Sequence, residues 1–165
     1  MLLRGDVKTL EAGQKTDIYH EHATDLQQQV NDFNKGIAID GSAFEANETP
    51  FSYGMACYPE KHEEAPNMES DIFYLKEKVK NGADYLVTQM FFDNEKYYAF
   101  VDRCRAEGIT VPIIPGIKPI VFKNQLTVLP KIFRSDIPEP FATELRKCKT
   151  DDEAKAVGVE WCIQQ

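Results

Sequence analysis

The most constraining feature of this chain is an apolar segment that ends in polar and aromatic side chains. It reads Gly-Ala-Asp-Tyr-Leu-Val-Thr-Gln-Met-Phe-Phe-Asp over residues 82–93. Amphipathic spacing predicts a helix from about Ser70 to Asn81 before it, a helix from about Asn94 to Glu107 after it, and then a strand over Val111–Gly116. Such alternation favours a parallel α/β sheet, whose ligands bind at the carboxyl ends of the strands. Gln89 is therefore expected where a planar heterocycle can meet an amide that both donates and accepts hydrogen bonds.

The rest of the chain continues the alternation of strands and helices. Met1–Leu3 is interpreted as the tail of a strand, and Phe51–Cys57 is predicted to be a full strand. A helix is expected from about Ala23 to Lys35, and the polar stretch that follows it is longer than a usual connection. Within that stretch Ile37–Ile39 is expected to pair locally. After the last strand, helices are expected over about Val121–Phe133, Pro140–Lys147 and Asp151–Gln164.

Composition narrows the classes of function. The net charge of -8 argues against a nucleic-acid surface, which needs clustered Lys and Arg. No apolar run approaches the roughly 20 residues of a membrane span, and no signal peptide precedes Leu2, so we expect no membrane partner and a cytoplasmic location. The cysteines lack a CxxC pair and a nearby His cluster, so reduced thiols and no metal site are expected at Cys57, Cys104, Cys148 and Cys162.

Several sequence blocks together resemble the flavin-dependent methylenetetrahydrofolate reductases, in that family's order and spacing. They are Leu3–Asp6, Tyr58–Ala65, Asp71, Leu75–Val79, Thr88–Asp93 and Ile113–Ile120. The resemblance implies an enzyme that reduces 5,10-methylenetetrahydrofolate to 5-methyltetrahydrofolate, with FAD as cofactor and NADH or NADPH as hydride donor. It also implies that the partners are the folate, the nicotinamide nucleotide and further copies of the chain in a homo-oligomer.

Length limits how much of the family's fold this chain can form. The family fold is a (β/α)8 TIM barrel, which typically needs about 250 residues, whereas this chain has 165. We therefore expect a single partial barrel domain over residues 1–165, with about strands four to seven and their helices, lacking the N-terminal strands and the last strand. The resemblance places the glutamate that protonates the pterin on the first strand, so this chain alone is expected to be inactive.

The resemblance assigns the residues nearest the chemistry to the first block. Arg4, Gly5 and Asp6 meet the flavin, where Gly permits close approach of the backbone. Asp6 is the expected catalytic residue, because a carboxylate beside the flavin pyrimidine would lower the reduction potential and face the cationic iminium formed from the folate. In an unrelated protein, the same three residues would be a solvated turn.

Further cofactor contacts follow from the same resemblance. Tyr58, His62 and Ala65 line the adenosine diphosphate part of FAD. Asp71 and Lys78 lie seven residues apart and share a helix face, with Asp71 towards the ribose or adenine and Lys78 near the pyrophosphate. His22 and Ala23 begin a helix, where backbone N–H groups readily hold a phosphate. The folate is assigned to Asp6, Gln89 and Gln125.

Alternatives remain open for these residues and for the function. Without a ligand, His62 would be a solvated side chain among glutamates. Asp71 would be a charge that interacts favourably with the helix dipole, and Gln125 would be a surface glutamine. A non-catalytic half-barrel that binds or assembles through its open strand edges is a second hypothesis. A different TIM-barrel enzyme is a third, and the combination of the Tyr58 and Gln89 blocks argues against it.

Overall fold

The computed structural model describes residues 1–3, 20, 22–46 and 48–165, and within them a three-stranded parallel sheet with six helices. The elements in chain order are α1 (Ala23–Asn34), β1 (Gly54–Cys57), α2 (Met68–Lys80), β2 (Tyr85–Met90), α3 (Asn94–Ala106), β3 (Ile113–Gly116), α4 (Gln125–Phe133), α5 (Glu139–Lys147) and α6 (Asp151–Gln164). The α/β class predicted from the sequence is confirmed.

The strands lie in the order β1-β2-β3, and both neighbouring pairs are parallel. Leu2 forms an isolated parallel bridge with Met55, which places the predicted strand tail on the outer side of β1. The pairing of β2 with β3 is irregular near its end, where the Gly116 amide donates to Thr88 Oγ1 at 2.8 Å. A Cβ atom at position 116 would lie 2.3 Å from the Thr88 carbonyl oxygen, so this close approach requires glycine.

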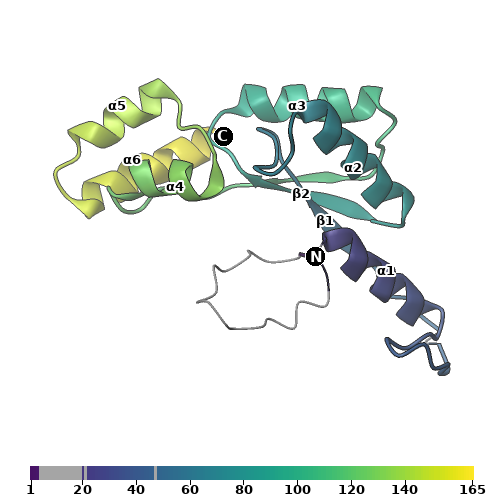
Figure 1. The fold of residues 1–165 in the computed structure, drawn as a ribbon. Helices are drawn as coiled ribbons and strands as arrows, with labels where there is room; N and C mark the ends of the chain where they lie inside the picture. The colour runs from purple at the N-terminus through teal and green to yellow at the C-terminus, as the bar shows by residue number, and fades with distance from the viewer. Residues whose placement is uncertain (4–19, 21, 47) are drawn as a thin grey trace, which may run out of the picture.

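One face of the sheet is buried beneath α2 and α3 (Figure 1). Alternate residues of a strand point to opposite faces, and the buried members Met55 and Leu86 are fully covered. The two helices contribute apolar side chains at helical spacing to this core, which are Ile72, Leu75, Phe100 and Cys104. Burial of this apolar surface is the main source of stability for the arrangement.

Helix α1 lies at the opposite end of the molecule from α4, α5 and α6 (Figure 1) and is joined to the sheet through a polar contact. The buried Gln27 side chain donates to the Lys78 carbonyl oxygen at 2.7 Å and to the Tyr53 hydroxyl at 3.2 Å. After α1, Ile37 pairs with Ala43 in an antiparallel bridge, which confirms the predicted local pairing.

The last three helices form a second apolar cluster beyond the end of β2. The Phe141 and Trp161 rings stack with centroids 4.5 Å apart, and the Trp161 indole N–H donates to the Phe92 carbonyl oxygen at 2.9 Å. Gly158 of α6 lies against the backbone of Ile120. The cluster is therefore anchored to the segments that follow β2 and β3.

Five elements begin at residues other than those predicted. Strand β3 begins at Ile113 rather than Val111, and α5 begins at Glu139 rather than Pro140. For the other three, side chains that bind backbone N–H groups explain the difference. Strand β1 begins at Gly54 rather than Phe51, and the Tyr53 amide donates to Asp84 Oδ2. Helix α2 begins earlier than Ser70, because Asn67 caps it by accepting from the Ser70 amide. Helix α4 begins at Gln125 rather than Val121, because Gln125 Oε1 accepts from the Val121 and Phe122 amides and closes a turn there.

The close contact of α6 gives a first prediction. A Cβ atom at Gly158 would lie 1.9 Å from the Ile120 carbonyl oxygen, so Gly158→Ala should lower the free energy of unfolding by about 1 to 3 kcal/mol through overpacking. Helix propensity alone would raise it by about 1 kcal/mol, so the sign separates the two effects. Urea denaturation followed by circular dichroism measures the change.

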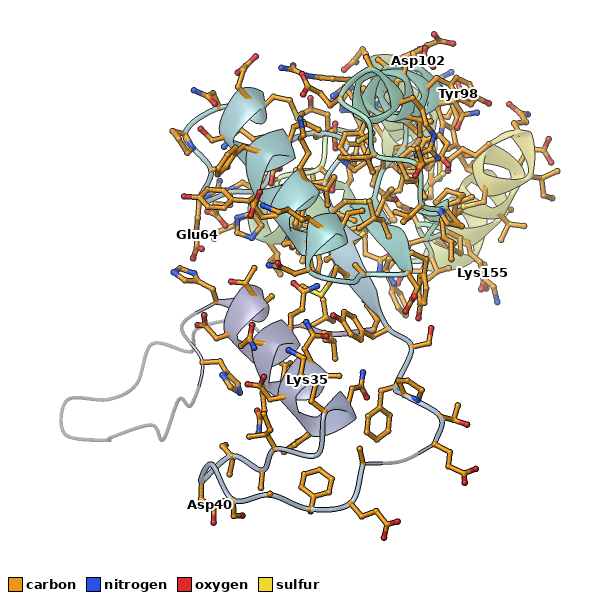
Figure 2. All side chains as sticks on the ribbon, turned by 90° about the vertical axis from the view of Figure 1, so that its right-hand side faces the viewer. Lys35, Asp40, Glu64, Tyr98, Asp102 and Lys155 are labelled. Carbon is orange, nitrogen blue, oxygen red and sulfur yellow. The ribbon has the colours of Figure 1, made fainter. Side chains whose placement is uncertain are left out.

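Lys155 provides the matched control for this test, because it lies on the same helix and its side chain is exposed (Figure 2). Lys155→Ala should change the free energy of unfolding by less than about 0.5 kcal/mol. A Gly158→Ala protein as stable as Lys155→Ala would show that α6 does not pack as described.

Candidate functional site

The three parallel strands end at one edge of the sheet, and the predicted ligand-binding segments follow them there. Cys57 pairs with Thr88, and Met90 pairs with Gly116, so the three strands end at similar heights. The Tyr58–Ala65 loop follows β1, Gln89 lies at the end of β2, and the segment that leads to Gln125 follows β3. In parallel α/β sheets this edge is where ligands bind.

The Tyr58–Ala65 loop, called the β1 loop below, is organised by its own side chains. Lys61 adopts a positive φ of 81°, and its ammonium donates to the carbonyl oxygens of His62 at 2.8 Å and Ala65 at 2.5 Å. The Tyr58 and His62 rings meet edge to face with centroids 4.5 Å apart. Tyr58, His62 and Ala65, which the sequence assigned to one part of the cofactor, are thus brought together in one turn.

Asp71 fastens the β1 loop to α2. Its Oδ2 accepts from the His62 amide at 2.7 Å, so a carboxylate in the first turn of the helix fixes the backbone of the loop. The position is also favourable for the helix, because the positive end of its dipole lies there. The structure therefore unites Asp71 with the loop residues, and a structural role and a ligand-facing role are compatible at this residue.

Lys78 lies two turns further along α2 and extends towards β1. Its ammonium donates to the Ala56 carbonyl oxygen at 3.2 Å. Burial lowers the pKa of Lys78 from its usual value, and the nearby Asp71 and Cys57 act in the opposite direction. The two residues predicted to share a helix face do interact electrostatically. Lys78 is thus a partly buried cation beneath the β1 loop.

The Gln89 side-chain amide is held in place by a hydrogen bond with the backbone of the next residue. Its Oε1 accepts from the Met90 amide at 2.9 Å. Within the described part of the chain, no residue accepts a hydrogen bond from its Nε2. The side chain therefore offers an N–H donor, held in place by its own oxygen, at the carboxyl end of the central strand.

Gln125 and His22 form hydrogen bonds with residues that are near them in the sequence. Gln125 Oε1 accepts from the Val121 and Phe122 amides at 2.7 and 3.1 Å, which fixes the turn after β3. The His22 amide donates to Asp25 Oδ2 at 2.7 Å as part of the cap of α1, and Ala23 packs against the core beneath the sheet. The predicted residues Arg4, Gly5 and Asp6 lie outside the described residues.

Sequence reasoning missed a group of charged residues next to the β1 loop. Lys96 of α3 lies 2.5 Å from both Glu60 Oε1 and Asp136 Oδ2, and Arg134 contacts Glu63 Oε1 at 2.8 Å. Glu60 and Glu63 belong to a motif that the sequence did single out. Their partners come from distant segments, so no short pattern signals the contacts.

Metal and membrane sites receive no support from the described residues. No group of three or more His, Cys, Asp or Glu side chains there is arranged to hold a metal ion. None of the helices in that part of the chain combines the length and apolar character needed to cross a membrane. All four cysteines are free thiols, and burial raises the pKa of Cys104 to about 11.

Comparison with known proteins gives a consistent result. The family model for methylenetetrahydrofolate reductase matches residues 1–165. A probable methylenetetrahydrofolate reductase (NADPH) of Caenorhabditis elegans is 42% identical over 115 residues, which are 69% of this chain and 17% of the relative. A 5,10-methylenetetrahydrofolate reductase of Pectobacterium carotovorum subsp. carotovorum is 34% identical over 157 residues, covering 94% of this chain and 46% of the relative. The chain spans less than half the length of these relatives.

A solved structure was also matched. It is an uncharacterized protein from Clostridium thermocellum that binds two copies of 5-methyl-5,6,7,8-tetrahydrofolic acid. The match has a TM-score of 0.48 and 20% sequence identity, and it covers 70% of this chain and 43% of that chain.

The environment of Lys78 predicts a pH dependence of stability. Because its pKa is lower in the folded chain, the folded state binds this proton less readily than the unfolded state does. Stability should therefore rise with pH between the lowered pKa and the usual value near 10.4, relative to a Lys78→Met protein that lacks the group. Urea denaturation of both proteins at several pH values from 7 to 10 measures the difference.

Lys80→Met controls for the loss of a charge from the same helix, because Lys80 is exposed. It should change the free energy of unfolding by less than about 0.5 kcal/mol. If the difference in the free energy of unfolding between wild type and Lys78→Met stays constant from pH 7 to pH 10, the Lys78 ammonium is not buried as described.

Proposed function

This chain belongs to the methylenetetrahydrofolate reductase family, and we propose that it supplies the nucleotide-binding part of a flavoenzyme that reduces 5,10-methylenetetrahydrofolate to 5-methyltetrahydrofolate. NADH or NADPH is the proposed hydride donor. The fold of these residues is proposed to be part of a (β/α)8 barrel, with about strands four to seven. The observation that carries the proposal is the β1 loop, fastened by Asp71 and underlain by Lys78 at the carboxyl edge of the sheet.

The residues of this site fit FAD by their chemistry. The Tyr58 and His62 rings offer aromatic surface for an adenine, and the partly buried Lys78 ammonium offers positive charge for a pyrophosphate. When bound, FAD would supply the capacity to accept a hydride and pass it to the folate. Tyr58, His62, Ala65, Asp71 and Lys78 are proposed to hold it, with His22 and Ala23 on its flank and Arg4 and Gly5 beside the flavin.

Gln89 is proposed to orient the folate. Its oxygen is held by the Met90 amide at 2.9 Å, so the amide N–H group is the part directed to a ligand. A pterin edge carries acceptors that such a donor can bind. Gln125 is proposed as a second amide on the folate side, where it already fixes the turn after β3.

Asp6 is the proposed catalytic residue, and its substitution tests the function in a complete reductase that carries this sequence. Asp6→Asn should leave FAD bound but slow folate reduction by about 10- to 1000-fold, as expected for one lost electrostatic contact in a site that excludes water. Stopped-flow absorbance of the flavin measures both half-reactions. Flavin reduction by NADH is the internal control, because it does not need the folate. A wild-type rate of the folate half-reaction would contradict the role of Asp6.

Gln89→Glu should act on folate affinity rather than on flavin reduction. A carboxylate at this position loses the N–H donor and places a negative charge that a pterin acceptor cannot satisfy. We expect the KM for the folate to rise while the rate of flavin reduction by NADH stays unchanged. An unchanged KM for the folate would show that Gln89 does not contact the pterin.

A role in assembly is a second candidate function, favoured by the open edge of β3. Among the described strands β3 pairs only with β2, and Ile114 and Ile117 at this edge are 45% and 47% exposed. Unpaired strand edges with apolar side chains promote association. The proposed partner is a second copy of this chain, in agreement with the homo-oligomer expected from the family resemblance.

Sedimentation velocity at tens of micromolar protein tests this association. The chain should sediment as a dimer or larger species, and Ile114→Lys should shift it towards monomer, since a charge at an edge strand opposes pairing. Ile39→Lys is the matched control, because Ile39 is 65% exposed and lies away from the sheet edge. A sharp monomer boundary for the wild-type chain would contradict the assembly role.

A further inference from the structure

Lys96 of α3 joins two segments that are far apart in the sequence. Its ammonium lies 2.5 Å from Glu60 in the β1 loop and 2.5 Å from Asp136 in the segment after α4. The Asp136 amide also donates to both carboxylate oxygens of Glu60 at 3.2 Å. Glu60, Lys96 and Asp136, called the Lys96 clasp below, thus form a closed set of contacts.

Two further contacts bring the same segments together. Arg134 donates through Nε and a terminal nitrogen to Glu63 Oε1, at 3.0 and 2.8 Å. Between Arg134 and Asp136, the buried Ser135 hydroxyl donates to the Met90 carbonyl oxygen at 2.9 Å. The segment 134–136 is therefore fastened both to the β1 loop and to the end of β2.

Packing alone does not hold the base of the β1 loop against α3. A pocket of about 500 Å³ that is open to the surface lies there, lined by Pro59, Met68, Phe100, Arg103 and the residues of the clasp. Because apolar contact is interrupted at this point, the ionic contacts carry more of the attachment. Figure 2 shows Tyr98 and Asp102 directed outward on α3. The Lys96 ammonium of the same helix instead reaches Glu60 of the β1 loop.

The burial of Glu60 makes the clasp stronger than an ordinary surface pair. Exposed pairs contribute little, but the Glu60 side chain is only 12% exposed. Burial raises the pKa of Glu60, although its hydrogen bond with Lys96 acts in the opposite direction. Burial acts to lower the pKa of Lys96, but the hydrogen bonds that its ammonium donates to the Asp136 and Glu60 carboxylates outweigh burial and raise the pKa. Loss of Lys96 would leave a largely buried carboxylate without its cation, and the loop would move to hydrate it.

We infer that Lys96 is a positioning residue, which holds the β1 loop against the end of β2 and the segment after α4 through Glu60 and Asp136. The inference rests on the proposed function only in regarding the β1 loop as the nucleotide-binding loop. Through the clasp, the segment that follows α4 and the β1 loop share one attachment. Movement of either segment would then be transmitted to the other.

Amide hydrogen exchange by NMR, without any nucleotide, tests this inference. The His62 and Asp136 amides, which donate to Asp71 and Glu60, report the opening of the two segments. Lys96→Met keeps the apolar stem but removes the charge, and should speed exchange of both amides by about tenfold. Lys96→Arg should restore exchange to within about threefold of wild type, because a guanidinium can bind two carboxylates.

Two controls separate positioning from a loss of overall stability. Lys76→Met breaks an exposed pair with Glu107 at 2.9 Å and should leave both amides unchanged. The Leu86 amide, buried in the sheet, reports global unfolding. If Lys96→Met speeds exchange at Leu86 as well, Asp136→Asn decides the question, since Asp136 is 77% exposed and its change does not threaten folding.

Local exchange at His62 and Asp136 that stays within twofold of wild type in both Lys96→Met and Asp136→Asn would overturn the inference. The proposed function is tested separately by adding FAD to the wild-type chain. An absence of flavin-dependent changes at the β1 loop would contradict the nucleotide site, and the exchange result would still decide the role of Lys96.

Discussion

The burial of one sheet face under α2 and α3 is the constraint on which the rest of this structure depends. Leu86 and Thr88 of β2 are buried on that face, so the period of two directs Gln89 to the other face. A shift of β2 by one residue would exchange the side chains of its two faces and place the Gln89 amide in the apolar core. Parallel pairing then aligns the carboxyl ends of the three strands, which brings the β1 loop and Gln89 to the same edge.

The helices that cover this face also carry residues of the candidate site. Helix α2 buries Ile72 and Leu75 while it presents Asp71 to the β1 loop and Lys78 to the carbonyl oxygen of Ala56. Helix α3 buries Phe100 and Cys104 in the same core, and its Lys96 binds the β1 loop from outside the sheet. The positions of the charged side chains are thus fixed by apolar packing, which is stronger than the contacts that the charged groups make themselves.

Apolar periodicity predicted the interior elements well and their beginnings less well. Strand β2 lies within the apolar segment 82–93 from which it was predicted, and helix α6 has the predicted bounds although its apolar residues do not gather on one face. The starts of β1, α2 and α4 differ because Asp84, Asn67 and Gln125 bind backbone N–H groups, an effect to which periodicity is insensitive. The family predicted from the motif blocks is confirmed by the match over residues 1–165.

The candidate site was predictable only where it is local in the sequence. Tyr58, His62 and Asp71 lie close together along the chain, and the structure brings the two rings into contact and joins the Asp71 carboxylate to the His62 amide. Lys96 lies 36 residues from Glu60 and 40 from Asp136, so this contact arises from tertiary packing alone. The hydrogen bond from the Met90 amide to Gln89 Oε1 depends on side-chain geometry, which cannot be predicted from the residue type.

The central claim is that the β1 loop receives the adenosine end of a flavin nucleotide, and intermolecular nuclear Overhauser effects test it most directly. With FAD added to the isotopically labelled chain, the adenine protons should show contacts with the Tyr58 and His62 rings and with the Ala65 methyl group. Contacts confined to other surfaces, such as the exposed aromatic pair Phe73 and Tyr74 on α2, would contradict the claim.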